Sequence, residues 1–130
     1  MKQDIRITGK VIHGDHIGRQ LGFPTANIDR RDYTRQKLHL KFGIYAGTVL
    51  VLNSKSEILN SKTAAIVIGP LDKRGLPKLE AHLLNFSGSL YGKKLKFEIG
   101  KKIRPWKKIA NMESLKRQIQ ADIQTIKSLQ

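Results

Sequence analysis

A glycine-rich segment near the N-terminus contains the residue types that nucleotide chemistry needs. Residues 14–27 read Gly-Asp-His-Ile-Gly-Arg-Gln-Leu-Gly-Phe-Pro-Thr-Ala-Asn. Gly14, Gly18 and Gly22 allow a backbone to approach a ligand closely and to adopt positive φ. Arg19 adds a permanently charged guanidinium that suits phosphate oxygens. The segment therefore has the composition of a phosphate-binding loop.

The end of the same segment could hold a metal ion. Pro24 fixes the direction of the chain, and Thr25 and Asn27 follow with two neutral oxygen donors of the kind that Mg²⁺ accepts. A Mg²⁺ site without its own carboxylate makes sense where nucleotide phosphates bring the balancing charge. The glycine spacing matches neither the P-loop nor the Rossmann fingerprint. Spacing alone therefore favours a ligand-binding loop and an ordinary surface turn equally.

Glu80 and His82 are the strongest candidates for acid–base chemistry. Residues 79–83 read Leu-Glu-Ala-His-Leu, which places three apolar side chains on one face of a strand and the polar pair on the other. Transfer of a phosphate to an alcohol needs a carboxylate or histidine to take the alcohol's proton. The pair faces either solvent or a cleft, and the residues alone favour solvent.

The elements that must position these residues are mostly strands. Alternation and β-branched content predict strands near residues 5–12, 42–52, 63–68, 79–86 and 94–99. The polar stretch 28–40 has no clean period and indicates a long excursion. From Asn111, apolar residues recur at helical spacing, which predicts a C-terminal amphipathic helix with Asn111 as its N-cap. Five or six strands and one helix indicate a small, mostly antiparallel barrel with the helix outside.

Composition sets the broad class of the protein. The 130 residues fit a single domain, residues 1–130, with enough chain to bury a core. The absence of cysteine excludes disulfides and thiolate zinc sites and suits a reducing compartment. There is no apolar run of membrane-spanning length and no signal-peptide pattern at the N-terminus. We expect a cytoplasmic monomer that does not enter a membrane.

Charge is the unusual property of this composition. The chain has 25 Lys and Arg against 10 Asp and Glu, a formal net charge of +15. Such a surface attracts anions, including nucleotides and nucleic acid, although most of these side chains suit a well-solvated surface. A small basic β-barrel that binds nucleic acid is retained as an alternative. The aromatic content of 6% offers few platforms for stacking bases, which counts against it.

Longer matches point to a known family. Residues 18–27 resemble the signature of the riboflavin kinase (flavokinase) family, whose Pro-Thr-Ala-Asn segment holds MgATP. Residues 80–86, Glu-Ala-His-Leu-Leu-Asn-Phe, resemble the family's catalytic strand. Residues 43–46, 90–93 and 103–105 resemble further family segments, so the likeness covers nearly the whole chain. The chain is similar to the C-terminal kinase domain of bacterial bifunctional riboflavin kinase/FAD synthetase, and nothing in it resembles that enzyme's nucleotidyltransferase half.

The resemblance implies a fold, an activity and a set of site residues. The implied fold is mainly β, a six-stranded antiparallel Greek-key barrel with a C-terminal α-helix. The implied activity is an ATP:riboflavin 5′-phosphotransferase that forms FMN and ADP with Mg²⁺ as cofactor. Glu80 would be the catalytic base, His82 a structural neighbour, and Thr25 and Asn27 the metal ligands. The implied ATP-binding residues are Gly14, Gly18, Arg19, Gly22, Pro24, Thr25, Asn27, Asn85, Leu90 and Tyr91.

The flavin side carries the departures from the family pattern. Arg104 is the candidate flavin contact there, and Trp106 could add an aromatic face to a ring system. Residues 69–73 differ from the usual segment, Asn85 stands where Asp is common, and Trp106 and Ile109 replace the usual Glu and Phe. These changes concern the identity or affinity of the acceptor. They therefore leave open the alternative that the domain binds flavin or nucleotide without turnover.

The segment beside the adenine carries its own alternative. In the family, residues matching Leu90 and Tyr91 lie next to the adenine ring. From the sequence, Tyr91 fits this role and that of a plain core aromatic nearly equally.

Overall fold

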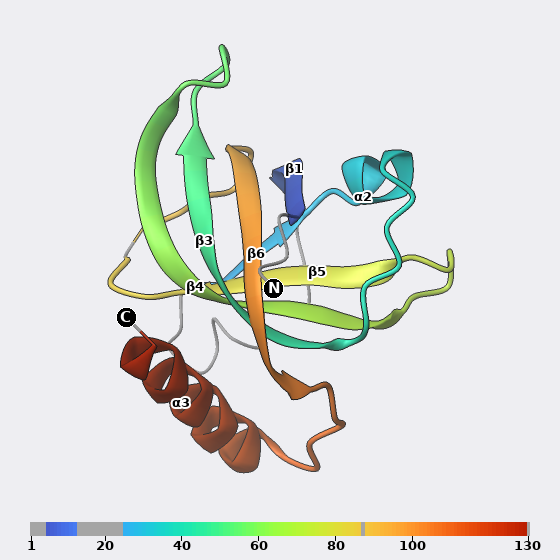
Figure 1. The fold of residues 1–130 in the computed structure, drawn as a ribbon, viewed down its shortest axis with the longest axis vertical. Helices are drawn as coiled ribbons and strands as arrows, with labels where there is room; N and C mark the ends of the chain where they lie inside the picture. The colour runs from blue at the N-terminus through green and yellow to red at the C-terminus, as the bar shows by residue number, and fades with distance from the viewer. Residues whose placement is uncertain (1–4, 13–24, 87, 130) are drawn as a thin grey trace.

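Six strands close into a barrel, and one long helix lies outside it. The computed structural model describes residues 5–12, 25–86 and 88–129 (Figure 1). The elements in chain order are β1 (Ile5–Ile12), β2 (Thr25–Ile28), α2 (Arg31–Arg35), β3 (Gly43–Leu52), β4 (Ile58–Leu71), β5 (Pro77–Leu83), β6 (Lys94–Pro105) and α3 (Met112–Ser128). The strands are neighbours in the closed order β1-β2-β5-β4-β3-β6, and the pairs are antiparallel.

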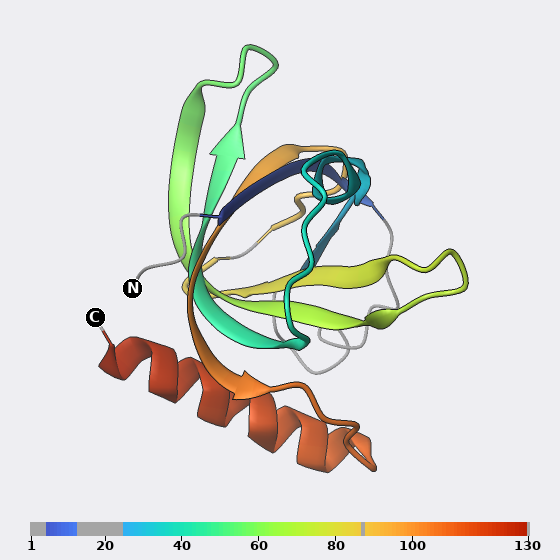
Figure 2. The same cartoon turned by 45° about the vertical axis from the view of Figure 1, so that its right-hand side comes forward.

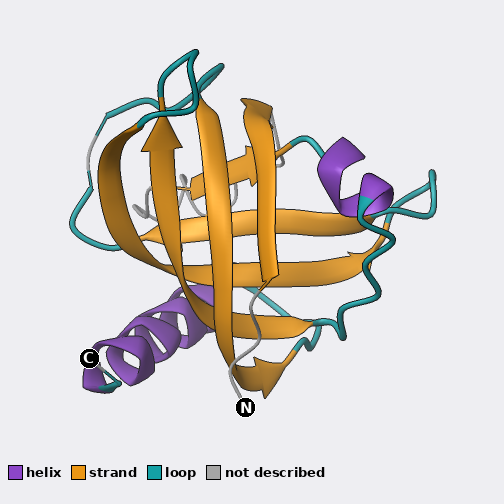
Figure 3. Cartoon of the chain, turned by 45° about the horizontal axis from the view of Figure 1, so that its top comes forward, coloured by secondary structure: helices purple, strands orange, loops and turns teal. Residues whose placement is uncertain are grey.

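This order confirms the predicted Greek-key barrel. Strands β3, β4 and β5 are successive neighbours, and β6 returns to lie beside β3, which is the Greek-key arrangement. Figure 3 shows the strands wrapped around one interior with α3 against the outside of the wall. The predicted C-terminal helix is also confirmed as α3. Its predicted N-cap is confirmed too, because the side chain of Asn111 accepts a hydrogen bond from the Ser114 N–H at 2.8 Å.

The barrel interior is filled by side chains that alternate along each strand. Ile7 of β1, Phe97 of β6 and Leu79 of β5 are each at most 1% exposed. On β5, the three inward side chains are those that the alternation of residues 79–83 predicted. A slip of one residue would turn Glu80 into the core, so burial of this face fixes the register strongly.

Five segments differ from the sequence-based expectations. Thr25–Ile28 forms the short strand β2, and the excursion 28–40 contains the helix α2. Strands β4 and β6 run well beyond the predicted 63–68 and 94–99. β5 ends at Leu83 instead of reaching Phe86, and Asn85 in the bend that follows has a φ of 53°, outside the range of a regular strand. The extra length of β4 lies mostly in exposed residues, which leave no pattern of burial in the sequence.

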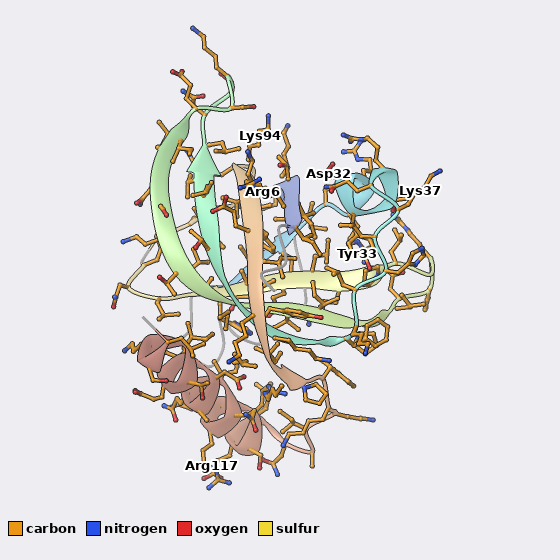
Figure 4. The ribbon with its side chains drawn as sticks, viewed as in Figure 1. Arg6, Asp32, Tyr33, Lys37, Lys94 and Arg117 are labelled. Carbon is orange, nitrogen blue, oxygen red and sulfur yellow. The ribbon has the colours of Figure 1, made fainter. Side chains whose placement is uncertain are left out.

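Helix α2 completes the barrel wall where strand pairing stops. β1 pairs with β2 only at Val11↔Ile28 and Ile12↔Asn27. Nearer the start of β1, the Thr8 N–H donates to Asp32 Oδ2 at 2.8 Å, and Gln36 Nε2 donates to the Arg6 carbonyl at 2.7 Å. Figure 4 labels Arg6 on β1 and Asp32 on α2 beside it. Side chains of the α2 segment therefore satisfy a strand edge that would otherwise face solvent.

Helix α3 covers the opposite outer face of the barrel (Figure 2). A second apolar cluster forms there between Ile126 of α3 and the outward side chains of Ile44, Ala65 and Val67. Neither helix in the described part of the chain is long and apolar enough to cross a membrane. Between this helix and the barrel, the apolar cluster gives way to charged side chains.

Candidate active site

Strands β2 and β5 bring four of the polar residues singled out above onto one outer face of the barrel. Thr25 lies opposite His82, and Asn27 lies opposite Glu80, in the antiparallel register of these strands. Cross-strand partners have Cβ atoms about 4.5–5.5 Å apart. Glu80 is 4% exposed and His82 is 7% exposed, so the expectation of a solvent-facing pair is wrong and the alternative of a lined cleft is correct.

A chain of polar contacts joins these residues. Thr25 Oγ1 lies 3.1 Å from His82 Nδ1, and His82 Nε2 lies 3.5 Å from Glu80 Oε1. The second carboxylate oxygen of Glu80 pairs with Lys78 Nζ at 2.9 Å. His82 therefore stands between the predicted metal ligand and the predicted base, and the Glu80 carboxylate is held from both sides.

Lys78 is a residue of this site that the motifs did not reveal. Its side chain is 34% exposed, whereas that of its partner Glu80 is 5% exposed. The alternation of β5 could have identified it, because residues 78, 80 and 82 share the outer face of the strand. The segment that resembles the family's catalytic strand begins at Glu80, so the resemblance does not include Lys78.

Glu80 borders a cavity between the barrel and α3. The cavity has a volume of about 290 Å³, near the lower end of the range for small-molecule sites. Its walls come from β3, β4, β5, the end of β6, the segment after β6, and α3. The lining residues are Ile44, Val67, Pro70, Lys78, Glu80, His82, Arg104, Trp106, Lys107, Lys108, Ile109, Leu115, Ile119 and Asp122. The predicted base and both predicted flavin-side residues thus line one cavity.

Arg104 forms part of the cavity wall through a buried ion pair. Its Nε and Nη2 donate to Asp122 Oδ1 and Oδ2, both at 2.8 Å, and Gln118 Nε2 adds a third contact to Oδ1 at 3.0 Å. This bidentate pair ties β6 to α3. Asp122 was not predicted, although it interrupts the apolar stripe of α3 between Ile119 and Ile126. That signal could have suggested a partner on the barrel.

Most of the departures from the family pattern lie in one of two places. Pro70, Trp106 and Ile109 line the cavity, and Trp106 is 36% exposed. The turn residue Asp72 instead pairs with Arg30 at 2.6 Å, at the start of α2. Hydrogen bonding from Arg30 holds the pKa of Asp72 below its usual range. The cavity-lining changes are those that would touch an acceptor.

The predicted nucleotide side is described only in part. Gly14, Gly18, Arg19, Gly22 and Pro24 lie outside the described residues, so their roles stay predictions. Asn85 is exposed in the bend after β5, and Leu90 packs against the core.

Tyr91 lies on the surface beside the end of β1. Its side chain is 59% exposed, so the interpretation as a core aromatic is wrong. Its neighbour Gly92 donates from its N–H to the Val11 carbonyl at 3.3 Å. This bond places Tyr91 near the end of the strand from which residues 13–24 continue, and its role beside the adenine stays a prediction.

The donor set of β2 fits a metal ion that arrives with a nucleotide. Among residues 5–12, 25–86 and 88–129, no group of three or more His, Cys, Asp or Glu side chains is placed to hold a metal. Thr25 and Asn27 are two apart on β2 and face the same side. A hydroxyl and an amide oxygen are hard, neutral donors, so phosphates would have to supply the charge.

Comparisons with known proteins agree with this geometry. Residues 1–130 match the family model described as Flavokinase: Riboflavin kinase. The chain is 40% identical over 118 residues to the bifunctional riboflavin kinase/FMN adenylyltransferase of Escherichia coli (strain K12), which covers 89% of this chain and 35% of that protein. It is 35% identical over 123 residues to the RNA-binding riboflavin kinase RibR of Bacillus subtilis (strain 168). That match covers 92% of this chain and 49% of the relative.

A solved structure supports the same assignment. Riboflavin kinase from Trypanosoma brucei matches this fold with a TM-score of 0.70 and 26% sequence identity, over 95% of this chain and 78% of that one. The chain therefore belongs to the riboflavin kinase family, whose members are enzymes that phosphorylate riboflavin. It spans 35% of the length of the bifunctional relative from Escherichia coli.

Proposed function

We propose that this chain transfers the γ-phosphate of ATP to the 5′-hydroxyl of riboflavin, with Mg²⁺ on the phosphates and Glu80 as the general base. The observation that supports these roles is the position of Glu80. Its carboxylate is buried next to the outward residues of β2 and borders the cavity that Arg104 and Trp106 also line. A base in such a position can reach both the nucleotide side and a bound alcohol.

Each residue then has a defined task. Glu80 accepts the proton of the 5′-hydroxyl as its oxygen attacks, and Lys78 and His82 keep the carboxylate from rotating away. Thr25 and Asn27 would hold Mg²⁺, which supplies charge neutralisation at the phosphates when it is bound. The hydroxyl of Thr25 can donate to His82 Nδ1 and still offer a lone pair to the metal. The position of the cavity between the barrel and α3 keeps water from competing with riboflavin for the phosphate.

The test separates the reaction from the binding of its substrates. The purified chain is incubated with riboflavin, ATP and Mg²⁺, and the flavins are separated and quantified. We expect FMN from the wild type and a loss of about 10²- to 10⁴-fold in turnover for Glu80→Gln, with ATP and riboflavin binding retained. Unchanged turnover in Glu80→Gln would contradict the role of Glu80. Riboflavin binding by the wild type without FMN formation would instead favour the non-catalytic alternative.

A second candidate function is RNA binding by the face around α2. Two open grooves of about 620 and 560 Å³ meet there, and both are lined by Arg31 and Arg35. Lys10 and Lys94 line the first groove, and Arg74 lines the second. Figure 4 shows Lys94 close to β1 and Lys37 on the outer side of the α2 region. One relative is named as RNA-binding, and the charge of +15 suits a nucleic-acid backbone.

Salt dependence tests this second candidate. Binding through phosphate contacts predicts that the logarithm of the RNA affinity falls linearly as the logarithm of the salt concentration rises. A labelled RNA duplex, titrated at several salt concentrations, measures that slope. No binding at low salt, or binding that salt does not weaken, would remove the candidate without affecting the kinase proposal.

A further inference from the structure

The cavity beside Glu80 is more cationic than a neutral acceptor requires. Its charged lining consists of four cationic and two anionic side chains, namely Lys78, Arg104, Lys107, Lys108, Glu80 and Asp122. Riboflavin carries no charge at neutral pH. A phosphate ester carries a charge of about −1.5 to −2. The charge of the lining therefore suits the phosphorylated product better than the acceptor.

Lys78 lies close to the place where that phosphate must form. Its Nζ lies 2.9 Å from Glu80 Oε2. A general base must approach the oxygen that it deprotonates to within about 2.6–3.2 Å. The 5′-oxygen is therefore held within about 6 Å of the Lys78 ammonium, a gap that its flexible four-carbon stem can close. Lys78 is also more exposed than Glu80, so its ammonium can be reached by a bound ligand.

We propose that Lys78 changes partner during the reaction, from the Glu80 carboxylate in the free protein to the 5′-phosphate of the product. The proposal rests on the proposed function, which places riboflavin in this cavity with its 5′-end at Glu80. It assigns to Lys78 recognition of the phosphate, a role distinct from proton transfer. None of the segments matched to the family above includes this position of the chain.

The charges that move in the reaction drive the exchange. The 5′-hydroxyl gives its proton to Glu80 while its oxygen forms a bond to the γ-phosphorus. The bond from that phosphorus to the bridging oxygen breaks, and the electron pair leaves on ADP. Glu80 thereby becomes neutral at the moment when an anionic phosphate appears beside it. The attraction that held Lys78 to Glu80 weakens, and a charge-assisted hydrogen bond to phosphate replaces it.

The experiment compares the affinities of the two flavins. Dissociation constants for riboflavin and FMN are measured by equilibrium dialysis without ATP, for the wild type, Lys78→Met, Lys78→Arg and Lys116→Met. We expect Lys78→Met to weaken FMN binding by about 10- to 100-fold, the effect of one lost charged hydrogen bond, and riboflavin binding by less than about 3-fold. Lys78→Arg should retain most of the FMN affinity. Lys116→Met, which removes an exposed lysine of α3 that does not line the cavity, should change neither affinity.

A second background separates contact from charge neutralisation. In the alternative explanation, Lys78 does not contact the phosphate and favours FMN merely by cancelling the repulsion between Glu80 and the phosphate. Lys78→Met is therefore repeated in the Glu80→Gln background, which removes that repulsion. A direct contact predicts that the FMN-specific loss persists in this background. Disappearance of that loss, or an equal loss for both flavins in the original background, would overturn the proposal. A wild-type protein that binds riboflavin and forms FMN in the same preparation shows that such a failure belongs to Lys78 and not to the proposed function.

Discussion

Charged side chains gather outside the barrel in two places, and the protein holds them in different ways. On the α3 side, Arg104 and Asp122 pair with side chains that are 19% and 7% exposed, and they wall a cavity. On the α2 side, Arg31 pairs with Asp29 although its own side chain is 84% exposed, and it lines open grooves. The Arg104–Asp122 pair is thus enclosed, whereas the arginine of the Arg31–Asp29 pair stays in contact with water.

The difference indicates what each region can do. Away from water, charges interact strongly and their geometry is fixed, which is the condition that proton and phosphate transfer need. In contact with water and salt, an ion pair adds little to stability and its partners can be exchanged for other ions. We therefore expect substitutions on the α3 side to affect folding and catalysis, and those on the α2 side to affect mainly the binding of anions.

The largest effect on stability is expected from Asp122→Ala. The change leaves the Arg104 guanidinium without its carboxylate between β6 and α3, where it is largely buried. Removing one member of a buried pair costs about 3–5 kcal/mol. Denaturant unfolding of the two proteins measures the loss, and flavin binding should weaken with it because α3 forms a wall of the cavity.

A double variant checks the reason for this loss. Replacing both members, as in Arg104→Leu with Asp122→Leu, removes the stranded charge as well as the pair. Such replacements are often close to neutral, so the double variant should regain most of the stability that Asp122→Ala loses. An Asp122→Ala variant as stable as the wild type would show that enclosure of the pair does not matter, and the contrast between the two sides would fail.

The next effect concerns Asp32, a carboxylate on the α2 side that bonds directly to a barrel strand. Asp32 accepts hydrogen bonds from the Thr8 N–H and from Gln36. Asp32→Ala leaves the strand edge of β1 without its acceptor, which costs about 1–3 kcal/mol. Asp32→Asn keeps an oxygen for the Thr8 N–H and should cost less. Equal losses for the two variants in chemical unfolding would assign the effect to charge instead of the hydrogen bond.

The faces of the site residues were predictable, and their partners were not. Alternation placed Glu80 and His82 together because residues 79–83 carry a strong period of two. The strand β2 was missed because it has only four residues and is defined by pairing with β5, far along the chain. Helix α2 was missed because five residues cannot sustain a helix without tertiary contacts such as those of Asp32.

The ion pairs of the site could not be predicted from the motifs. Lys78 and Glu80 are close in sequence, but the burial that makes their pair important comes from the cavity and its walls. The flavin contact of Arg104 stays a prediction, and the structure adds a partner that the motifs did not reveal, because its guanidinium binds Asp122, 18 residues away. Motifs indicate which residues a site contains, and only the fold determines which of them are already occupied by one another.

The third prediction is a pH dependence at the Arg30–Asp72 pair, whose side chains are 17% and 37% exposed. Hydrogen bonding from Arg30 lowers the pKa of Asp72 below its ordinary value of 3.8. A lowered pKa means that the pair stabilises the fold at any pH above 3.8, and that this contribution is lost as the pH falls through the folded-state pKa. Arg30→Met should therefore lower the unfolding midpoint by more near neutral pH than in acid, where only the bond from Arg30 to the Pro77 carbonyl is still lost. A constant difference at every pH would assign the effect to the bond from Arg30 to the Pro77 carbonyl.

The smallest effect on the fold is expected from Arg31→Met, and it separates the two regions most directly. The pKa of Asp29 is lowered mainly by its hydrogen bond from Arg31, yet solvent surrounds the arginine, so we expect no measurable change in the unfolding midpoint or in FMN formation. If the α2 face binds RNA, the same variant should reduce the slope of its salt dependence by about 1, the value for one lost phosphate contact. A loss of stability like that of Asp122→Ala would show instead that exposed pairs also hold this fold. Intact stability with a reduced slope would place the function of the α2 charges outside the barrel, in the anions that they attract.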